Sequence, residues 1–284
     1  MSHDKKPLIG VLALQGAFVE HQRCLESVGC RTVQVRTPSE LNDIDGIVLP
    51  GGESTAMSLI GTRGDKDIWS SLKIFCAQKP TWGTCAGMIL LSEKCVGTSA
   101  VIENGQSLIG GMDILVCRNY FGSQISSFEM PTPAPPDCGD SDPFPGIFIR
   151  APAILSTGPD VQILGTVTAT PCKQAAVILE ELERKITAGE HFIQMGVMDC
   201  LTRKGEGLSY KEVKRLHDEN DATYLSLKES IKLPGAADGS NSRQVICAVR
   251  KDYTLCTAFH PELTHDYRWH GFFRDMVLDF KARE

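Results

Sequence analysis

The sequence contains no apolar run that approaches the roughly 20 residues of a membrane-spanning helix. Residues 1–7 are polar and lead directly into a short apolar segment, a start that differs from a secretory signal. We therefore expect neither a membrane span nor secretion. Acidic side chains outnumber basic ones by 35 to 29, and this net charge of -6 gives no reason to expect nucleic acid or an anionic membrane as a partner.

No Cys-x-x-Cys pair occurs among the eleven cysteines, and their number is odd. In a chain of 284 residues without a signal, this pattern is typical of reduced thiols in the cytoplasm. His260, His265 and His270 follow one another at a spacing that does not suit one face of a helix, and no further ligand completes a metal-binding set. We expect no metal site and no cofactor.

Short apolar runs alternate with segments of helical periodicity. Leu8–Leu14 and Asp45–Leu49 are too apolar for strands with one exposed face, and Ala17–Gly29 repeats its apolar residues at helical spacing. This alternation predicts an α/β fold, a flavodoxin-like three-layer sandwich whose mostly parallel central sheet has helices on both faces. Ligands of such sheets bind beyond the carboxyl ends of the strands. Further strands are expected at Arg31–Val35, Leu108–Val116, Gly146–Arg150, Val245–Val249 and Thr254–Phe259, and further helices at Ser54–Ile60, Asp67–Gln78, Ala175–Ile186 and Asp266–Lys281.

The composition changes between residues 168 and 242. Ala175–Ile186 is amphipathic, and Pro234–Ser242 resembles a flexible linker. We predict a single domain over residues 1–284 that carries residues 168–242 as an insertion, partly helical and partly flexible. Met130–Pro145 is rich in proline and glycine and is expected to be a loop.

The segment Gly83-Thr84-Cys85-Ala86-Gly87 has the G-x-nucleophile-x-G pattern of a nucleophile elbow, between a predicted strand and a predicted helix. Such a turn strains the backbone of its middle residue, and the glycines let neighbouring backbone pass without a clash. The Cys85 side chain would then stand above the sheet edge and face the positive end of the helix, which favours a thiolate. A buried cysteine in a glycine-bordered turn stays open as the alternative.

A second segment, Phe259-His260-Pro261-Glu262, ends another strand-like run. Residues two apart on an extended segment project to the same side. One ring nitrogen of His260 can then meet Cys85 while Glu262 holds the other, which gives a nucleophile, a base and an orienting group. The pattern alone also fits a surface histidine and glutamate at a proline turn.

A third segment, Pro50-Gly51-Gly52-Glu53-Ser54, joins a predicted strand to a predicted helix. Its two glycines allow backbone N–H groups to point at a developing oxyanion, and Glu53 is placed to accept a substrate ammonium. The plain alternative is a turn in which Glu53 or Ser54 caps the helix.

Together these segments resemble the triad-type (class I) glutamine amidotransferases. Within them, the sequence is most similar to the glutaminase subunits of pyridoxal 5′-phosphate synthases, over roughly residues 8–165 and 245–280. The elbow and the His-Pro-Glu segment indicate the class, whereas LALQGA, RN-x-FG and FIRAP narrow it to the vitamin B6 branch. The motifs are LALQGAFVEH at 12–21, LPGGEST at 49–55, GTCAGMI at 83–89, RNYFGSQ at 118–124, SFE at 127–129, FIRAP at 148–152 and HPELT at 260–264.

By this resemblance, Cys85 is the nucleophile, His260 the general base and acid, and Glu262 the residue that orients His260. Free glutamine carries an ammonium and a carboxylate, so its pocket needs an acidic group and an arginine of fixed geometry. The implied substrate contacts are Gly52, Glu53, Ser54, Arg118, Ile149 and Arg150, and the implied oxyanion or partner-coupled positions are Gln15, Gly51 and Ala86. Ser123 stands where the family commonly has arginine.

The resemblance implies an enzyme that hydrolyses L-glutamine to glutamate and ammonia through a cysteine thioester. It also implies a partner, the synthase subunit of pyridoxal 5′-phosphate synthase, which receives the ammonia within a hetero-oligomeric complex. Two alternatives stay open: a glutaminase that serves another ammonia-using synthase, such as that of histidine biosynthesis, and a non-catalytic α/β interaction scaffold.

Overall fold

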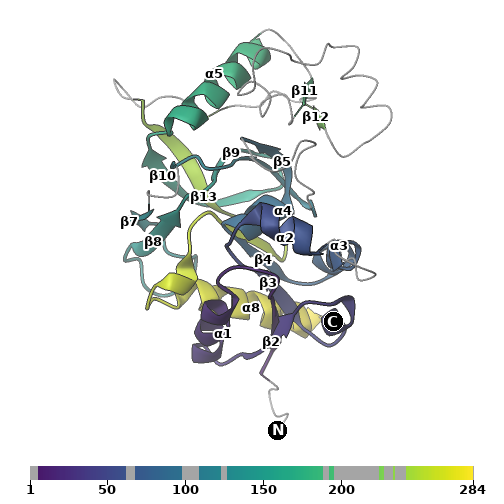
Figure 1. Ribbon diagram of the computed structural model, residues 1–284. Coiled ribbons are helices and arrows are strands. Elements are labelled where there is room, and N and C mark those ends of the chain that lie inside the picture. The colour runs from purple at the N-terminus through teal and green to yellow at the C-terminus, as the bar shows by residue number, and fades with distance from the viewer. Residues whose placement is uncertain are drawn as a thin grey trace.

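The computed structural model describes residues 6–61, 68–97, 109–122, 127–187, 192–194, 224–226, 233 and 241–283. A ten-stranded mixed sheet forms the centre of this part of the chain (Figure 1). Its strands are β1 (Leu8–Leu12), β2 (Arg31–Val35), β3 (Gly46–Leu49), β4 (Thr81–Thr84), β5 (Ser92–Val96), β6 (Met112–Cys117), β9 (Ala153–Thr157), β10 (Gln162–Ala169), β13 (Arg243–Lys251) and β14 (Thr254–Thr257). The helices are α1 (Phe18–Ser27), α2 (Ser54–Gly61), α3 (Ile68–Gln78), α4 (Ala86–Leu91), α5 (Lys173–Thr187) and α8 (Arg268–Arg283).

The strands β2, β1, β3, β4 and β14 lie side by side in this order and run parallel. Every residue of β3 and β4 is buried, as the uninterrupted apolar runs predict for strands covered on both faces. The predicted α/β fold with a mostly parallel central sheet is therefore confirmed. The carboxyl ends of β3, β4 and β14 meet at one edge, where the three sequence motifs begin.

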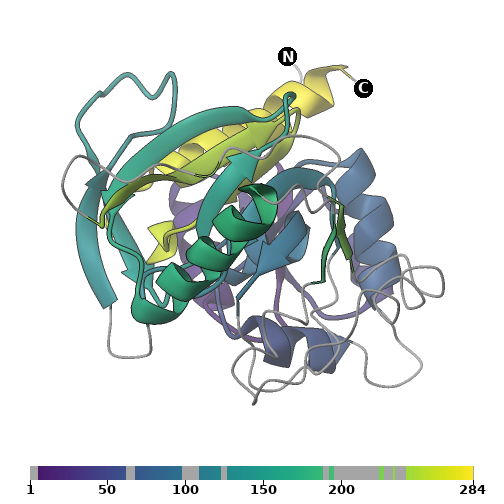
Figure 2. The same ribbon diagram turned by 90° about the horizontal axis from the view of Figure 1, so that it is seen from above.

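Helices cover both faces of this parallel part (Figures 1 and 2). Neighbouring residues of a strand point to opposite faces. The ring of Trp82 contacts His21 of α1 and His270 of α8, whereas Gly83 lies against Gly87 and Leu91 of α4. Helices α1 and α8 therefore cover one face, and α4 covers the other together with α2, which it contacts.

Beyond β14 the sheet is mixed. The strand β13 pairs antiparallel with β14, β9 and β10, and β9 pairs antiparallel with β6, whereas β6 and β5 at the edge run parallel. A separate hairpin of β7 (Ser127–Thr132) and β8 (Phe144–Ile149) lies beside this sheet. The prediction that Met130–Pro145 forms a loop is wrong at both ends of this segment, since Pro131 and Pro145 lie opposite one another in the hairpin. In a two-stranded ribbon each strand has a free edge, so a proline without an N–H is tolerated there.

The first residues of the predicted insertion belong to the sheet, since β10 ends at Ala169. The helix expected at Ala175–Ile186 is present as α5, and β11 (Phe192–Gln194) pairs with β12 (Tyr224–Ser226). Most of the remainder of the predicted insertion lies outside the described residues, so the domain organisation stays a prediction. In the described part of the chain, no helix is long and apolar enough to cross a membrane.

Candidate active site

Cys85 occupies a strained turn between β4 and α4. Its φ of 47° lies in the left-handed region that L residues rarely adopt, and its N–H donates to the carbonyl of Thr257 at 2.8 Å. A Cβ on Gly87 would lie 1.9 Å from the carbonyl oxygen of Leu49, so only glycine lets α4 pack onto the end of β3. The turn has the geometry of the predicted elbow.

The side chain of His260 reaches Cys85 because β14 runs parallel to β4, with Thr257 opposite Thr84. The chain then continues from β14 to His260, whose N–H donates to the carbonyl of Ile147 in β8 at 2.8 Å. The imidazole makes a hydrogen bond with the sulfur of Cys85. Cys85 is only 6% exposed, less than the motif predicts.

Glu262 holds the other side of the imidazole. Its Oε1 lies 2.7 Å from Nδ1 of His260, which leaves Nε2 to face the sulfur of Cys85. Both side chains are buried, and they are joined by the short 3₁₀ turn Pro261–Leu263. A thiol from one part of the sequence and an imidazole and a carboxylate from another therefore lie in a row, in the order of a catalytic triad, and their catalytic roles stay a prediction.

The contacts within this row shift the pKa values of His260 and Glu262 in opposite directions. Burial alone would lower the pKa of His260, but the interactions with Cys85 and Glu262 raise it well above its usual value. Burial would raise the pKa of Glu262, but its hydrogen bond and its ionic interaction with His260 hold it below its usual value. A buried imidazole that keeps its proton beside a sulfur can both activate that sulfur and return a proton to a leaving group.

The Pro-Gly-Gly loop after β3 packs directly against the ring of His260. A Cβ on Gly51 would lie 2.3 Å from Cε1 of His260. The carbonyl of Gly51 accepts a hydrogen bond from the N–H of Ala17 at 3.1 Å, and Oε1 of Gln15 accepts one from the N–H of Glu53 at 2.6 Å. The predicted Gln15 and Gly51 are thus brought to the triad, with Ala86 beside Cys85, and their oxyanion role stays a prediction.

The variant Gly51→Ala is expected to lower kcat for glutamine hydrolysis about 100-fold, because the new methyl group displaces the imidazole from the sulfur of Cys85. Ammonia release measures the effect. Gly271→Ala in α8 is the matched control, since a Cβ there meets nothing within 4 Å. Unchanged kcat in Gly51→Ala would show that the loop does not set the position of His260.

Glu53 acts as a helix cap in the structure. Its Oε2 accepts a hydrogen bond from the N–H of Ala56 at 2.7 Å, at the start of α2. The alternative in which Glu53 caps the helix is therefore present in the structure. The contact of Glu53 with a substrate ammonium stays a prediction. Ser54 is the first residue of α2, but its side chain lies outside the described part, as does the whole of Ser123.

The two predicted arginines lie at the ends of strands. Arg118 directly follows β6, and its N–H donates to the carbonyl of Val96 in β5 at 2.8 Å. Ile149 ends β8, the strand bonded to His260, and Arg150 follows it with a positive φ of 46°. Both residues are half-buried. Their contacts with a substrate stay a prediction.

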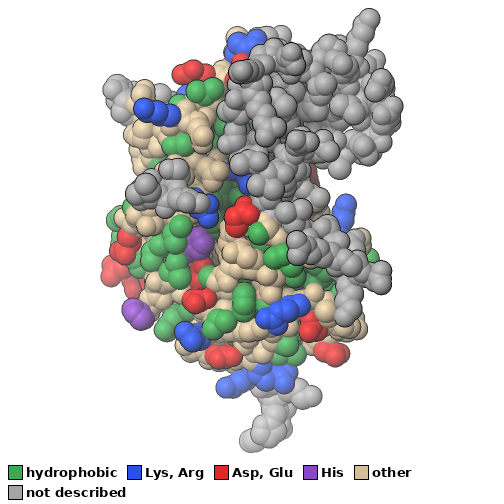
Figure 3. Space-filling view, viewed as in Figure 1, with side chains coloured by type: hydrophobic (Ala, Val, Ile, Leu, Met, Phe, Trp, Pro, Cys, Tyr) green, Lys and Arg blue, Asp and Glu red, His purple; other side chains and the backbone are tan. Residues whose placement is uncertain are grey.

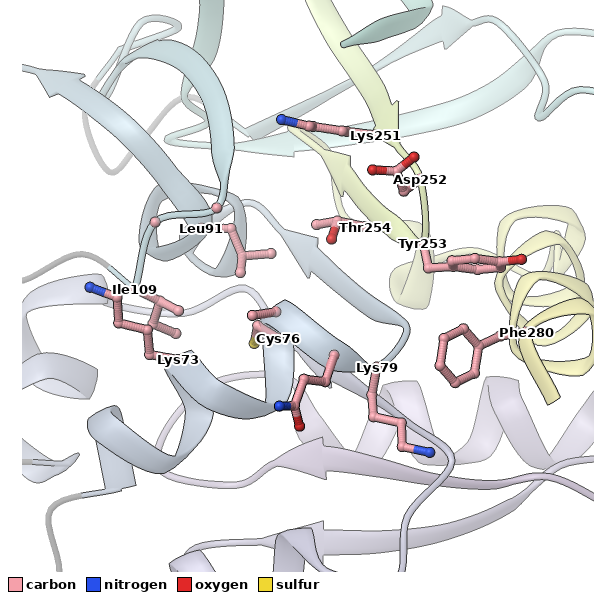
Figure 4. A pocket seen from close by; sticks show the side chains of 14 residues that line it. Lys73, Cys76, Lys79, Leu91, Ile109, Lys251, Asp252, Tyr253, Thr254 and Phe280 are labelled. Carbon is pink, nitrogen blue, oxygen red and sulfur yellow. The ribbon is translucent and has the colours of Figure 1, made fainter. Parts of the chain in front are cut away.

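A cavity of about 380 Å³ lies at the opposite edge of the sheet (Figure 4). It is lined by Thr254, the first residue of β14, and by Lys79, which precedes β4, so it faces away from Cys85. The ammonium groups of Lys73, Lys79 and Lys251 point in different directions and do not converge (Figure 4). On the surface shown in Figure 3, acidic and basic side chains are interspersed among apolar ones, so charge alone marks no docking face there.

Comparison with known proteins gives the family. A match to the SNO glutamine amidotransferase family covers residues 11–181, more than half of the chain. The chain belongs to this family. A relative from Arabidopsis thaliana, the probable pyridoxal 5′-phosphate synthase subunit PDX2, is 34% identical over 277 residues, which cover 96% of this chain and 87% of the relative.

Two bacterial relatives of this SNO-family amidotransferase carry the name pyridoxal 5′-phosphate synthase subunit PdxT. The protein from Acidothermus cellulolyticus is 33% identical over 274 residues, 96% of this chain and 94% of the relative. That from Carboxydothermus hydrogenoformans is 45% identical over 161 residues, 56% of this chain and 78% of the relative. A crystal structure of a glutamine amidotransferase matches with a TM-score of 0.60 at 24% identity, over 95% of this chain and 98% of that chain, which supports the fold.

The structure of this SNO-family member also places two further side chains, neither expected from the sequence as a site residue, in a row with the triad. His21 and His270 are fully buried; His21 contacts Glu262, and His270 contacts His21. In the sequence, His21 is one of the residues at helical spacing in Ala17–Gly29, and His270 is considered only as a metal ligand. The one available signal was that His21 ends the LALQGAFVEH motif.

Proposed function

We propose that this chain is the glutaminase subunit of a pyridoxal 5′-phosphate synthase, with Cys85 as its nucleophile. It hydrolyses L-glutamine to glutamate and ammonia and supplies the ammonia for vitamin B6 biosynthesis. The row of Cys85, His260 and Glu262 at the carboxyl ends of β4 and β14 is the observation that carries the proposal. Relatives that span most of the chain and are named as subunits of this synthase support it.

In the first half of the reaction, the sulfur of Cys85 attacks the side-chain amide carbon of glutamine. A tetrahedral intermediate forms, and its oxyanion is expected to meet backbone N–H groups near Gly51 and Ala86. The C–N bond then breaks, and the nitrogen leaves as ammonia after it takes a proton from His260. A γ-glutamyl thioester remains on Cys85.

In the second half, water replaces ammonia at the same carbon. His260, now neutral, accepts a proton as the water oxygen attacks the thioester. The C–S bond breaks, glutamate leaves, and the sulfur and the imidazole return to their starting pair. Glu262 stays bonded to Nδ1 of His260 throughout, so Nε2 always faces the reacting atoms.

A synthase subunit in a hetero-oligomeric complex receives the ammonia, and its docking arranges the oxyanion donors around Gln15 and Gly51. In the described part, the Gln15 side chain is bonded to the N–H of Glu53, so this loop is where docking would act. We further propose that the protein works in the cytoplasm, because every described cysteine is a free thiol.

An ammonia-release assay with glutamine, run with and without the synthase subunit, tests the proposal. Release is expected to increase strongly when the synthase subunit is added. No release under either condition, together with failure of a glutamine-analogue electrophile to label Cys85, would favour the scaffold alternative. Co-purification with a different ammonia-using synthase would favour the other glutaminase alternative.

A further inference from the structure

A row of buried polar side chains continues from Glu262 into the protein interior. Nε2 of His21 lies 3.3 Å from Oε2 of Glu262, and Nδ1 of His21 lies 3.0 Å from Nε2 of His270. His21 comes from α1 and His270 from α8, and both are fully buried. Two further imidazoles therefore extend the row of the triad on the side of Glu262 that is remote from His260.

The second oxygen of Glu262 needs a hydrogen-bond donor. Among the residues that the structure describes, Oε2 of Glu262 accepts no hydrogen bond, although it is buried. Burial of a carboxylate oxygen without a donor is unfavourable. Nε2 of His21 is in position to donate, since it lies 3.3 Å from this oxygen and 3.2 Å from Oγ1 of Thr84. A small rotation of the ring moves its N–H from one oxygen to the other.

One assignment of the ring protons gives each contact in the row one donor and one acceptor. A carboxylate only accepts hydrogen bonds, so the Nε2 of His21 that faces it must carry the hydrogen. In a neutral imidazole the other nitrogen, Nδ1, then accepts, and Nε2 of His270 donates to it. This leaves Nδ1 of His270 without a hydrogen, in agreement with its lack of a partner among the described residues.

Burial favours the neutral form of the His21 ring. Burial lowers the pKa of His21 and outweighs the attraction of Glu262; His260 lowers it further, while Glu20 on the same helix raises it. Burial and the neighbouring His21 also hold the pKa of His270 well below its usual value. Of the two histidines that face Glu262, only His260 therefore has a raised pKa.

We propose that His21 is a positioning residue of the glutaminase reaction, which donates from Nε2 to Oε2 of Glu262 and so keeps Oε1 on Nδ1 of His260. This inference rests on the glutaminase function proposed above. The reacting atoms do not touch His21, so its effect passes through the orientation of Glu262 and His260.

Two substitutions separate this role from a structural link between α1 and α8. In His21→Gln the side-chain amide nitrogen lies three bonds from Cβ, as Nε2 does, and so reaches Glu262. In His21→Asn it lies two bonds from Cβ, as Nδ1 does, and so reaches only His270. If His21 positions Glu262, His21→Gln keeps kcat within about threefold of wild type, whereas His21→Asn lowers kcat about tenfold with KM unchanged.

The kinetic test uses ammonia release by the complex with the synthase subunit, and thermal unfolding is recorded for each variant. Leu25→Ala on the same helix is the control for lost stability, because Leu25 is buried in the apolar core. Equal losses of kcat in His21→Gln and His21→Asn would overturn the proposal. A loss in proportion to the thermal destabilisation, matched by Leu25→Ala, would overturn it as well.

A second readout needs no activity. The Nδ1–H proton of His260, bonded to a carboxylate, gives a far-downfield NMR signal in the isolated chain, assigned by its absence in His260→Gln. This signal is expected in wild type and His21→Gln and lost in His21→Asn. If it persists in His21→Asn, the positioning role is wrong. If wild type shows the signal but the complex releases no ammonia, the proposed glutaminase function is wrong. The signal in His21→Asn still decides whether His21 positions Glu262 and His260.

Discussion

Replacement of Cys85 by alanine is expected to reduce glutamine hydrolysis by roughly 10⁴-fold or more, to the background of the assay. The variant keeps the Cβ and the strained turn, so the fold remains, but no sulfur is left to form the thioester. The complex of this variant with the synthase subunit is expected to make product from added ammonium salts at the wild-type rate. Ammonia release from glutamine and product formation from ammonium salts are the two measurements.

Cys30→Ala is the matched control for this experiment. Cys30 is also buried, and burial raises its pKa to about 11, so its thiol has no nucleophilic role. This control should keep full activity with glutamine. Persistent glutamine hydrolysis in Cys85→Ala would contradict the assignment of the nucleophile.

The sequence predicted the parts of the site whose geometry is set by a few neighbouring residues. A G-x-C-x-G turn between a buried strand and a helix places Cys85 at the carboxyl end of β4. The His-Pro-Glu segment follows a strand of the same kind, and strands covered on both faces run parallel with their carboxyl ends at one edge. The sequence alone therefore predicts that two such segments lie at the same edge of the sheet.

The remaining parts depend on packing between distant elements. Helices α1 and α8 each show only an apolar stripe in the sequence, and it is their contact that brings His21 to His270. Likewise, Gly51 approaches His260 closely only because β3 and β14 lie on the two sides of β4, and this strand order cannot be read from the sequence. The strands β9 and β10 were not predicted. Residues 153–167 were assigned to no element, and only the last two residues of β10, Thr168 and Ala169, fall within the predicted insertion.

The variant Glu262→Gln is expected to lower kcat for glutamine hydrolysis roughly 10³-fold, with little change in KM. The amide has the shape of the carboxylate but no charge, so it no longer stabilises the protonated ring of His260, whose pKa should fall. The amide can also present its NH₂ group to Nδ1 of His260, which then accepts instead of donating. In that arrangement Nε2 carries the hydrogen and cannot take a proton from water.

Two measurements separate these effects of Glu262→Gln. An NMR titration of His260 records the fall in its pKa, and the pH profile of kcat records the fraction of enzyme in the active protonation state. Glu93→Gln removes the same charge from an exposed position and should change neither. A lowered pKa of His260 with wild-type kcat would mean that Glu262 tunes the charge of the ring but does not orient it. Unchanged values of both would remove Glu262 from the triad.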